Sequence, residues 1–158
     1  MQQHNSLLEV YRIAYKKWAD KLVASGYAAR WNSHGFYVIY TAENRSLACL
    51  ENLVHRNGFG SDNDYFIMTI NIPNTVATTK IGTTELPQGW NLPNENAHLL
   101  CRSFGDNWIK SQKSCCLIVP SAIIENEKNI LINPNHNDFD KVKLSLSQPF
   151  SFDNRLSI

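Results

Sequence analysis

Four polar side chains in this sequence lie beside predicted apolar elements and have types that can do chemistry: Arg30, Tyr40, Glu51 and Ser121. The guanidinium fork of Arg30 can bind phosphate in a bidentate way. Tyr40 offers an aromatic face for stacking or for a cation, and Ser121 offers a hydroxyl for hydrogen bonding. A carboxylate such as Glu51 stabilises positive charge that develops in a transition state. These four residues are the candidate site of the chain.

Each of them also has an ordinary structural explanation. Arg30 in a loop can be a solvated or ion-paired surface group, and Tyr40 can be a core residue whose hydroxyl reaches the surface. Glu51 can be an exposed helix residue paired with His55, four residues later. Ser121 follows a proline and can be a turn residue or a helix N-cap. Residue types and spacing alone therefore indicate no particular reaction.

Generic catalytic and metal motifs do not occur in the sequence. It contains no Walker loop, no GxGxxG and no GxSxG. The five histidines, at positions 4, 34, 55, 98 and 136, are never four residues apart, and no Cys and His cluster has zinc-ligand spacing. We therefore expect no bound metal. Asp153 and Arg155 near the C-terminus can form a local ion pair.

The element that must position Glu51 is a predicted helix from about residue 44 to residue 56. At 100° per residue, one arc of this helix is apolar and carries Leu47, Leu50, Leu53 and Val54. Glu51 and His55 lie together at the edge of that arc. The pattern therefore predicts a carboxylate at the margin of the buried face.

The remaining segments predict a mixed domain. We expect strands at 10–14, 36–41, 65–73, 115–119, 129–132 and 142–146. Helical spacing of Tyr15, Trp18 and Leu22 predicts a helix that ends at Gly26, and 97–112 is a further helix. Residues 74–96 are irregular. About six strands and about three helices indicate the α+β class in a single domain over residues 1–158.

Composition narrows the classes of function. Hydrophobic residues make up 43% of the 158 residues, enough for one core, and a formal net charge of +1 leaves no basic face for nucleic acid. The start, MQQHNSLLE, does not resemble a signal peptide, and no apolar run approaches the roughly 20 residues that span a bilayer. We expect a cytoplasmic protein. The four cysteines should be reduced, mostly buried thiols: Cys49, Cys101, Cys115 and Cys116.

Eight spaced segments, in order, closely resemble the RES domain family. They are YRIA (11–14), RWNSHG (30–35), VIYTAENRSLACLENLVH (38–55), GW (89–90), GDNW (105–108), LIVPSAI (117–123), NILINPNH (129–136) and PFSFDNRL (149–156). The family takes its name from an arginine, a glutamate and a serine, which match Arg30, Glu51 and Ser121. The chain departs from the family at Ala28 and Ala29, where members usually have glycines before RWN.

The resemblance implies a compact α+β domain like the ADP-ribosyltransferase fold, with mixed small sheets, and NAD+ as substrate. Glu51 would stabilise the oxocarbenium-like ribose when the nicotinamide bond breaks, and Tyr40 would carry the nicotinamide ring. Arg30 would bind the pyrophosphate, and Ser121 would hydrogen-bond the nicotinamide or its ribose. His55 would orient Glu51 or the ligand. Asn133 and Arg155 are expected to be structural.

The resemblance further implies a toxin that arrests growth by degrading NAD+, through hydrolysis or phosphorolysis, and that is neutralised by an Xre-type helix-turn-helix antitoxin. DNA binding would then belong to that partner. A homodimer is expected from the family alone. Two alternatives stay open: transfer of ADP-ribose to a host protein, and a catalytically silent module that only binds the antitoxin.

Overall fold

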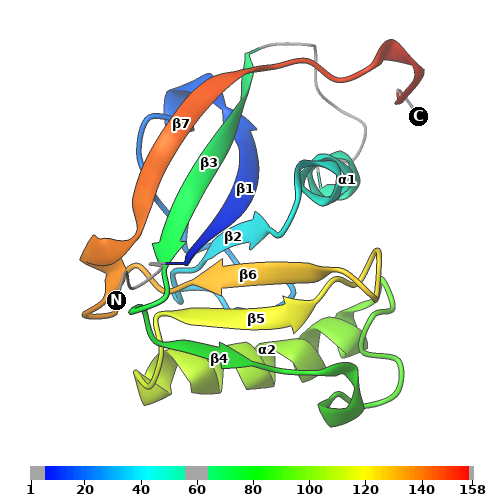
Figure 1. The fold of residues 1–158 in the computed structure, drawn as a ribbon. Helices are drawn as coiled ribbons and strands as arrows, with labels where there is room; N and C mark the ends of the chain where they lie inside the picture. The colour runs from blue at the N-terminus through cyan, green and yellow to red at the C-terminus, as the bar shows by residue number, and fades with distance from the viewer. Residues whose placement is uncertain (1–5, 56–63, 157–158) are drawn as a thin grey trace.

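Seven strands of the computed structural model form one mixed sheet in the order β4-β5-β6-β2-β1-β3-β7 (Figure 1). The structure describes residues 6–55 and 64–156. The strands are β1 (Leu7–Tyr15), β2 (Ile39–Ala42), β3 (Tyr65–Pro73), β4 (Thr78–Lys80), β5 (Cys116–Pro120), β6 (Lys128–Ile132) and β7 (Lys143–Phe150). All neighbouring strands are antiparallel except β4 and β5, which are parallel.

Two α-helices and four short 3-10 turns complete the part of the chain that the structure describes. The α-helices are α1 (Arg45–His55) and α2 (Glu95–Ser111). The 3-10 turns are η1 (Lys16–Trp18), η2 (Thr83–Glu85), η3 (Phe139–Lys141) and η4 (Asn154–Leu156). Asn44 and Asn94 begin the two helices, because their side-chain oxygens accept hydrogen bonds from backbone N–H groups of the first turn.

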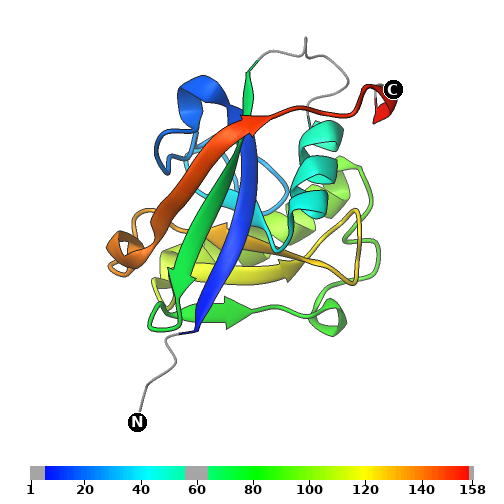
Figure 2. The same cartoon turned by 45° about the horizontal axis from the view of Figure 1, so that its top comes forward.

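The sheet has a narrow seam at its centre, where β1 meets β2. Only Tyr11 and Ala42 are paired across it. β1 pairs along nine residues with β3 on its other side, and β2 pairs along four residues with β6. The two halves therefore diverge from the seam and run in different directions, as Figures 1 and 2 show. This divergence opens space between β1 and β2.

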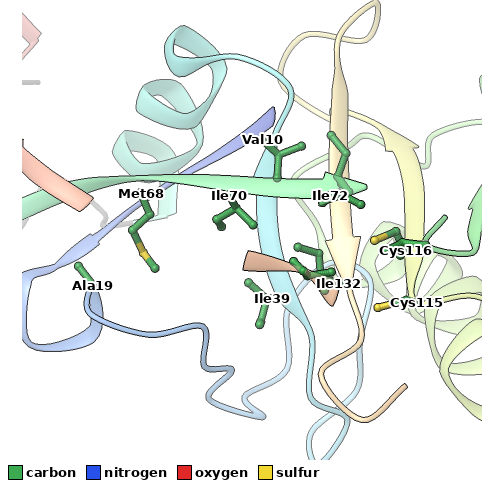
Figure 3. Close-up of a cluster of buried hydrophobic side chains, with 12 residues drawn as sticks. Val10, Ala19, Ile39, Met68, Ile70, Ile72, Cys115, Cys116 and Ile132 are labelled. Atoms are coloured by element: carbon green, nitrogen blue, oxygen red, sulfur yellow. The ribbon is translucent and has the colours of Figure 1, made fainter. Parts of the chain in front are cut away.

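Three apolar clusters hold the halves and the helices together. The first lies between the diverging halves and includes Val10, Ile39, Met68, Ile70 and Ile132 (Figure 3). A second cluster packs α2 against the half that contains β4, β5 and β6, through Cys101, Trp108, Leu117 and Leu131. A third cluster packs α1 over β1 and β3. Burial of these side chains is the main source of stability.

The α+β class of a single compact domain is confirmed, with two differences from the sequence-based prediction. The strands form one seven-stranded sheet in place of the small sheets, and the described residues contain two α-helices, because the helix predicted from Tyr15 to Gly26 does not form. Instead, β1 continues to Tyr15, which pairs with Tyr65 of β3, and their rings stack at 4.7 Å between centroids. Strand pairing and aromatic packing therefore override the local helical spacing.

Other predicted elements agree with the structure within a few residues, although the segment 74–96 contains the short strand β4 and the last strand is longer than expected. None of the four cysteines forms a disulfide, and three of them, Cys101, Cys115 and Cys116, are buried. None of the helices in the described ranges is long and apolar enough to cross a membrane.

Candidate active site

The divergence of β1 and β2 creates a cavity of about 560 Å³. Its walls are β1, the loop that contains residues 25–31, β2 and the inward face of α1. Four predicted site residues line it: Arg30, Tyr40, Glu51 and His55. Ser121 does not line the cavity, although the next residue, Ala122, does. The structure therefore brings together candidates from three separate segments of the chain.

Glu51 points into the cavity, because the side of α1 that faces inward differs from the side that was predicted to be buried. Leu50 and Val54, expected on the buried face, are exposed at 36% and 54%, whereas Leu47 and Ala48 are buried. At 100° per residue, Glu51 lies between Leu47 and Ala48 around the helix, at the middle of the inward face. The prediction that Glu51 lies at the edge of the buried face was wrong, because the side of α1 that lines the cavity carries the small Ala48 and polar residues.

Both carboxylate oxygens of Glu51 have partners. Ser121 Oγ donates to Oε1 at 3.0 Å, and His55 Nε2 lies 3.2 Å from Oε2. The Glu51 side chain is 21% exposed, whereas that of His55 is 67% exposed. The first contact therefore fixes the carboxylate from within the fold, and the second reaches it from the mouth of the cavity. The predicted pairing of Glu51 with His55 is present together with the inward position.

The Ser121 hydroxyl is held in one orientation. It follows β5, is fully buried, and accepts hydrogen bonds from the backbone N–H groups of Ile123 and Ile124 at 3.0 and 3.1 Å. A hydroxyl has two lone pairs and one proton. Because the two amides occupy the lone pairs, the proton is directed at Glu51. Ser121 therefore combines the turn role of the ordinary explanation with a contact to the carboxylate.

Arg30 reaches the cavity from the RWN loop and also holds a neighbouring turn. Its Nη1 donates to the carbonyl oxygen of Trp90 at 2.7 Å, and its Nη2 donates to that of Leu92 at 3.2 Å. A guanidinium has five N–H donors, so it can still bind a ligand. These contacts place Arg30 beside the turn that contains the GW segment (89–90).

The RWN loop is held by α2. Asp106 accepts from the backbone N–H and the hydroxyl of Ser33, and Arg102 Nε donates to the carbonyl oxygen of Ala29 at 2.8 Å. At Gly105 a Cβ would lie 1.6 Å from the carbonyl oxygen of Trp31, so only glycine allows this approach. The GDNW segment therefore positions Arg30 from a distance. Ala28 and Ala29 have no positive φ, so the loop does not require glycine there.

Tyr40, in β2, presents its ring to the cavity while its hydroxyl is fully engaged. The hydroxyl accepts from the backbone N–H of Trp31 at 3.1 Å and donates to Asn32 Oδ1 at 2.5 Å. Burial raises the pKa of Tyr40. The side chain is therefore a neutral, rigid aromatic wall and does not serve as a base.

Arg12, in β1, is a cavity residue that the sequence-based reasoning did not single out. It lines the cavity, and none of the residues that the structure describes gives it a hydrogen bond or ion pair. Burial lowers the pKa of the guanidinium. An unpaired, mostly buried cation is costly and suits an anionic ligand. The available signal was a lone arginine in the apolar strand segment VYRIA.

No cluster of metal-ligating side chains was found among residues 6–55 and 64–156. Asp153 and Arg155 form the predicted local ion pair at 2.8 Å. Asn133 is fully buried, and its side-chain oxygen accepts from the backbone N–H of Asn135. These residues lie outside the lining of the cavity.

The amino-acid sequence that forms this cavity matches a known protein family. The model of the RES domain family covers residues 9–153. The chain belongs to the RES domain family. In this RES domain, the family glutamate and serine, Glu51 and Ser121, are in contact, and the family arginine, Arg30, lines the same cavity as Glu51.

Named relatives and one solved structure resemble the RES domain over most of its length. It is 37% identical to a "Prs ADP-ribosylating toxin" of Sphingobium sp., covering 87% of this chain and 88% of that protein. It is 36% identical to a "Toxin Res" of Yersinia enterocolitica, covering 93% and 98%. A chain of the M. tuberculosis MbcT-MbcA toxin-antitoxin complex shares the fold, with a TM-score of 0.66 and 18% identity over 93% of this chain and 86% of that chain.

Proposed function

We propose that this RES domain is the toxin of a toxin-antitoxin pair and cleaves the bond between nicotinamide and ribose in NAD+. The observation that carries the proposal is the Glu51 carboxylate, fixed by Ser121 in a cavity that also contains two guanidinium groups, Arg12 and Arg30. A dinucleotide offers two negative phosphates and a glycosidic bond whose cleavage creates positive charge. The cavity has a complementary group for each.

Glu51 acts on the reacting ribose. Loss of nicotinamide gives the sugar oxocarbenium character, and a fixed carboxylate stabilises this charge mainly in the transition state. Since the Ser121 proton is already directed at Glu51, the carboxylate needs little reorganisation when the charge develops. Ser121 is therefore a positioning residue in this mechanism, and its direct contact with nicotinamide stays a prediction. His55 contacts the second carboxylate oxygen, Oε2, from the mouth of the cavity.

The remaining residues bind the substrate. The fixed ring of Tyr40 offers a face to the cationic nicotinamide, an attraction of roughly 0.5 to 2 kcal/mol. Arg12 and the free donors of Arg30 bind the pyrophosphate. NAD+ is thus a substrate that needs no further cofactor. Water or inorganic phosphate attacks the ribose after nicotinamide leaves, and either acceptor releases free nicotinamide.

Transfer of ADP-ribose to a protein is a second candidate. The relative from Sphingobium sp. carries the name "Prs ADP-ribosylating toxin". The same cavity performs this reaction when a protein nucleophile replaces water. Stable ADP-ribose on protein at near-stoichiometric yield would favour it. A silent binding module is disfavoured, since it has no need for a carboxylate with both oxygens oriented inside a cavity.

An antitoxin is the partner we propose. The solved structure with the same fold is a toxin-antitoxin complex by its title, and relatives are named Toxin Res. An Xre-type helix-turn-helix protein would block the cavity and bind DNA, since this chain has a formal net charge of only +1. A homodimer and a cytoplasmic location complete the proposal.

The decisive experiment is nicotinamide release by the purified chain, with NAD+ as substrate, in buffers with and without inorganic phosphate. We expect release of one nicotinamide per NAD+ consumed and a fall of cellular NAD+ when the chain is induced without an antitoxin. Absence of release under both conditions, from a folded protein that also labels no protein, would overturn the proposal. A product that carries phosphate on the ribose would identify phosphorolysis.

A further inference from the structure

A second cavity adjoins the site and has a different character. It measures about 500 Å³ and shares Arg12, Ile13, Ser25, Asn52 and His55 with the first cavity. Its own walls are largely apolar and aromatic: Ala14, Tyr15, Trp18, Val23, Ala24 and Tyr65. The two spaces are therefore lobes of one cleft that meet at Arg12 and Asn52. The first lobe contains Glu51, and the second contains the aromatic side chains.

Trp18 is the side chain of this wall that we consider for a ligand, and Lys17 Nζ lies 5.3 Å from the centroid of its ring. Tyr15 and Tyr65 stack on each other with centroids 4.7 Å apart, and Trp18 in η1 is 50% exposed. A flat, uncharged ring system such as a nucleobase is stabilised by stacking on an aromatic side chain. None of the described residues that line this lobe is an aspartate or glutamate, and its basic side chains, Arg12 and His55, also line the first lobe.

Asn52 presents an unsatisfied acceptor at the junction. Its Nδ2 donates to the carbonyl oxygen of Ile13 at 3.3 Å, which fixes the amide plane and leaves Oδ1 as the free end. Oδ1 is buried and accepts no hydrogen bond from any residue that the structure describes. A buried carbonyl oxygen without a donor costs free energy, which a ligand hydroxyl or amino group can recover.

We propose that the second lobe holds the adenosine half of the dinucleotide, and that Asn52 Oδ1 accepts a hydrogen bond from a hydroxyl of the adenosine ribose. The proposal rests on the proposed function, because the Glu51 lobe places the nicotinamide end. Arg12 at the junction binds the pyrophosphate, and this anchors the middle of the substrate. The adenosine ribose then follows the pyrophosphate toward Asn52, and the adenine reaches Trp18.

This arrangement selects among nucleotides. An acceptor such as Asn52 Oδ1 pairs with a ribose hydroxyl, which has a proton to donate. The 2′-phosphate of NADP+ carries negative oxygens with no proton to give, so it would face the acceptor unpaired. A site whose buried polar group is left unpaired rejects the analogue. The chain should therefore prefer NAD+ to NADP+, and a dinucleotide to nicotinamide mononucleotide.

Equilibrium binding of ADP-ribose tests the inference separately from cleavage. The ligands are ADP-ribose, its 2′- and 3′-deoxyadenosine analogues, and 2′-phospho-ADP-ribose, measured by calorimetry. Wild-type protein should bind at least one deoxy analogue and the 2′-phospho compound at least ~10-fold more weakly than ADP-ribose. In Asn52→Leu that difference should shrink to less than ~3-fold. Equal binding of all four ligands by the wild-type protein would overturn the proposal.

Asn71→Leu is the matched control. Asn71 is a half-buried asparagine of β3 with an unsatisfied Oδ1, but it lines neither lobe. It should keep the wild-type ligand preferences. If Asn52→Leu and Asn71→Leu discriminate among the ligands equally, Asn52 has no recognition role and the inference is wrong. If Asn52→Leu does not fold, the wild-type ligand series alone decides between the two outcomes.

The adenine wall has its own test. Trp18→Ala should raise the Kd for adenosine monophosphate and ADP-ribose by ~5-fold or more, whereas Trp18→Phe, which keeps a stacking face, should recover most of the affinity. Equal affinity in wild-type and Trp18→Ala protein would remove adenine from this lobe. If the protein binds ADP-ribose in this Asn52-dependent way but releases no nicotinamide, the inference stands and the proposed function is wrong. If the protein releases nicotinamide but binds ADP-ribose independently of Asn52, the proposed function stands and the inference is wrong.

Discussion

The hydroxyl of Ser121 lies 3.0 Å from Glu51 Oε1, a contact between residues seventy positions apart in the chain. It joins the turn after β5 to the centre of α1, and the backbone N–H groups of Ile123 and Ile124 occupy the remaining sites of that hydroxyl. The carboxylate in the cavity is therefore held by the half of the sheet opposite to the one that carries Arg12. The two family residues are thus joined by a direct hydrogen bond.

Ser121→Ala should affect stability and turnover together. The change leaves a buried carboxylate oxygen and two amides without their partner, so the free energy of unfolding should fall by about 1–3 kcal/mol in urea denaturation. Nicotinamide release should fall by ~10-fold, mostly in kcat, because Glu51 loses its orientation while the substrate contacts remain. Ser46→Ala, at an exposed position in α1, is the control. An unchanged kcat in folded Ser121→Ala would contradict the positioning role.

Glu51→Gln should remove activity and leave the fold intact. A glutamine keeps the size of the side chain and an oxygen that accepts from Ser121, but it loses the negative charge. We expect turnover to fall by ~100-fold or more with the Kd for NAD+ changed much less, and toxicity to disappear. Glu125→Gln, at an exposed position, should match the wild type. Wild-type nicotinamide release by folded Glu51→Gln would refute the catalytic assignment.

Arg12→Met and Arg30→Met should separate binding from stability. Arg12 has no partner among the described residues, so its removal should weaken NAD+ binding by ~10-fold or more while stability stays equal or rises. Arg30→Met should weaken binding and also lower the free energy of unfolding by about 1–3 kcal/mol, since the carbonyl groups of Trp90 and Leu92 lose their donors. Calorimetry and urea unfolding measure both, with exposed Arg155→Met as control. Tight NAD+ binding by Arg12→Met would remove Arg12 from the site.

Asp138 should make the fold sensitive to acid. The backbone N–H of Ala77, 2.9 Å away, and Lys141 hold the pKa of the Asp138 carboxyl below its usual range. A lowered pKa means that the stabilisation is complete above the unfolded value of about 3.9 and is lost as the pH falls below it. Asp138→Asn should therefore lose less stability than the wild type between pH 5 and about pH 3 in thermal melts. Asp140→Asn, beside it and exposed, serves as comparison, and identical acid profiles for the wild type and Asp138→Asn would exclude this role.

The sequence by itself determined those strands and helices whose residue patterns lie entirely within the element. The segment YFIMTINIP predicted the strand at 65–73, and apolar spacing predicted the helix at 97–112; both are present. The ordered segments around Arg30, Glu51 and Ser121 were sufficient to identify the family. Tyr40 was found because an aromatic residue at the end of an apolar strand is visible in the chain itself.

Tertiary structure decided where these residues point and what they contact. Local spacing predicted a helix after residue 14, but pairing with β3 keeps Tyr15 in a strand, and the side of α1 that packs inward is set by β1 and β2. Arg12 and Asn52 gain their significance from a cavity that exists because β1 and β2 diverge after one residue pair. Local patterns report a residue's neighbours along the chain, whereas an unpaired guanidinium or the bond from Ser121 to Glu51 depends on elements brought together by packing.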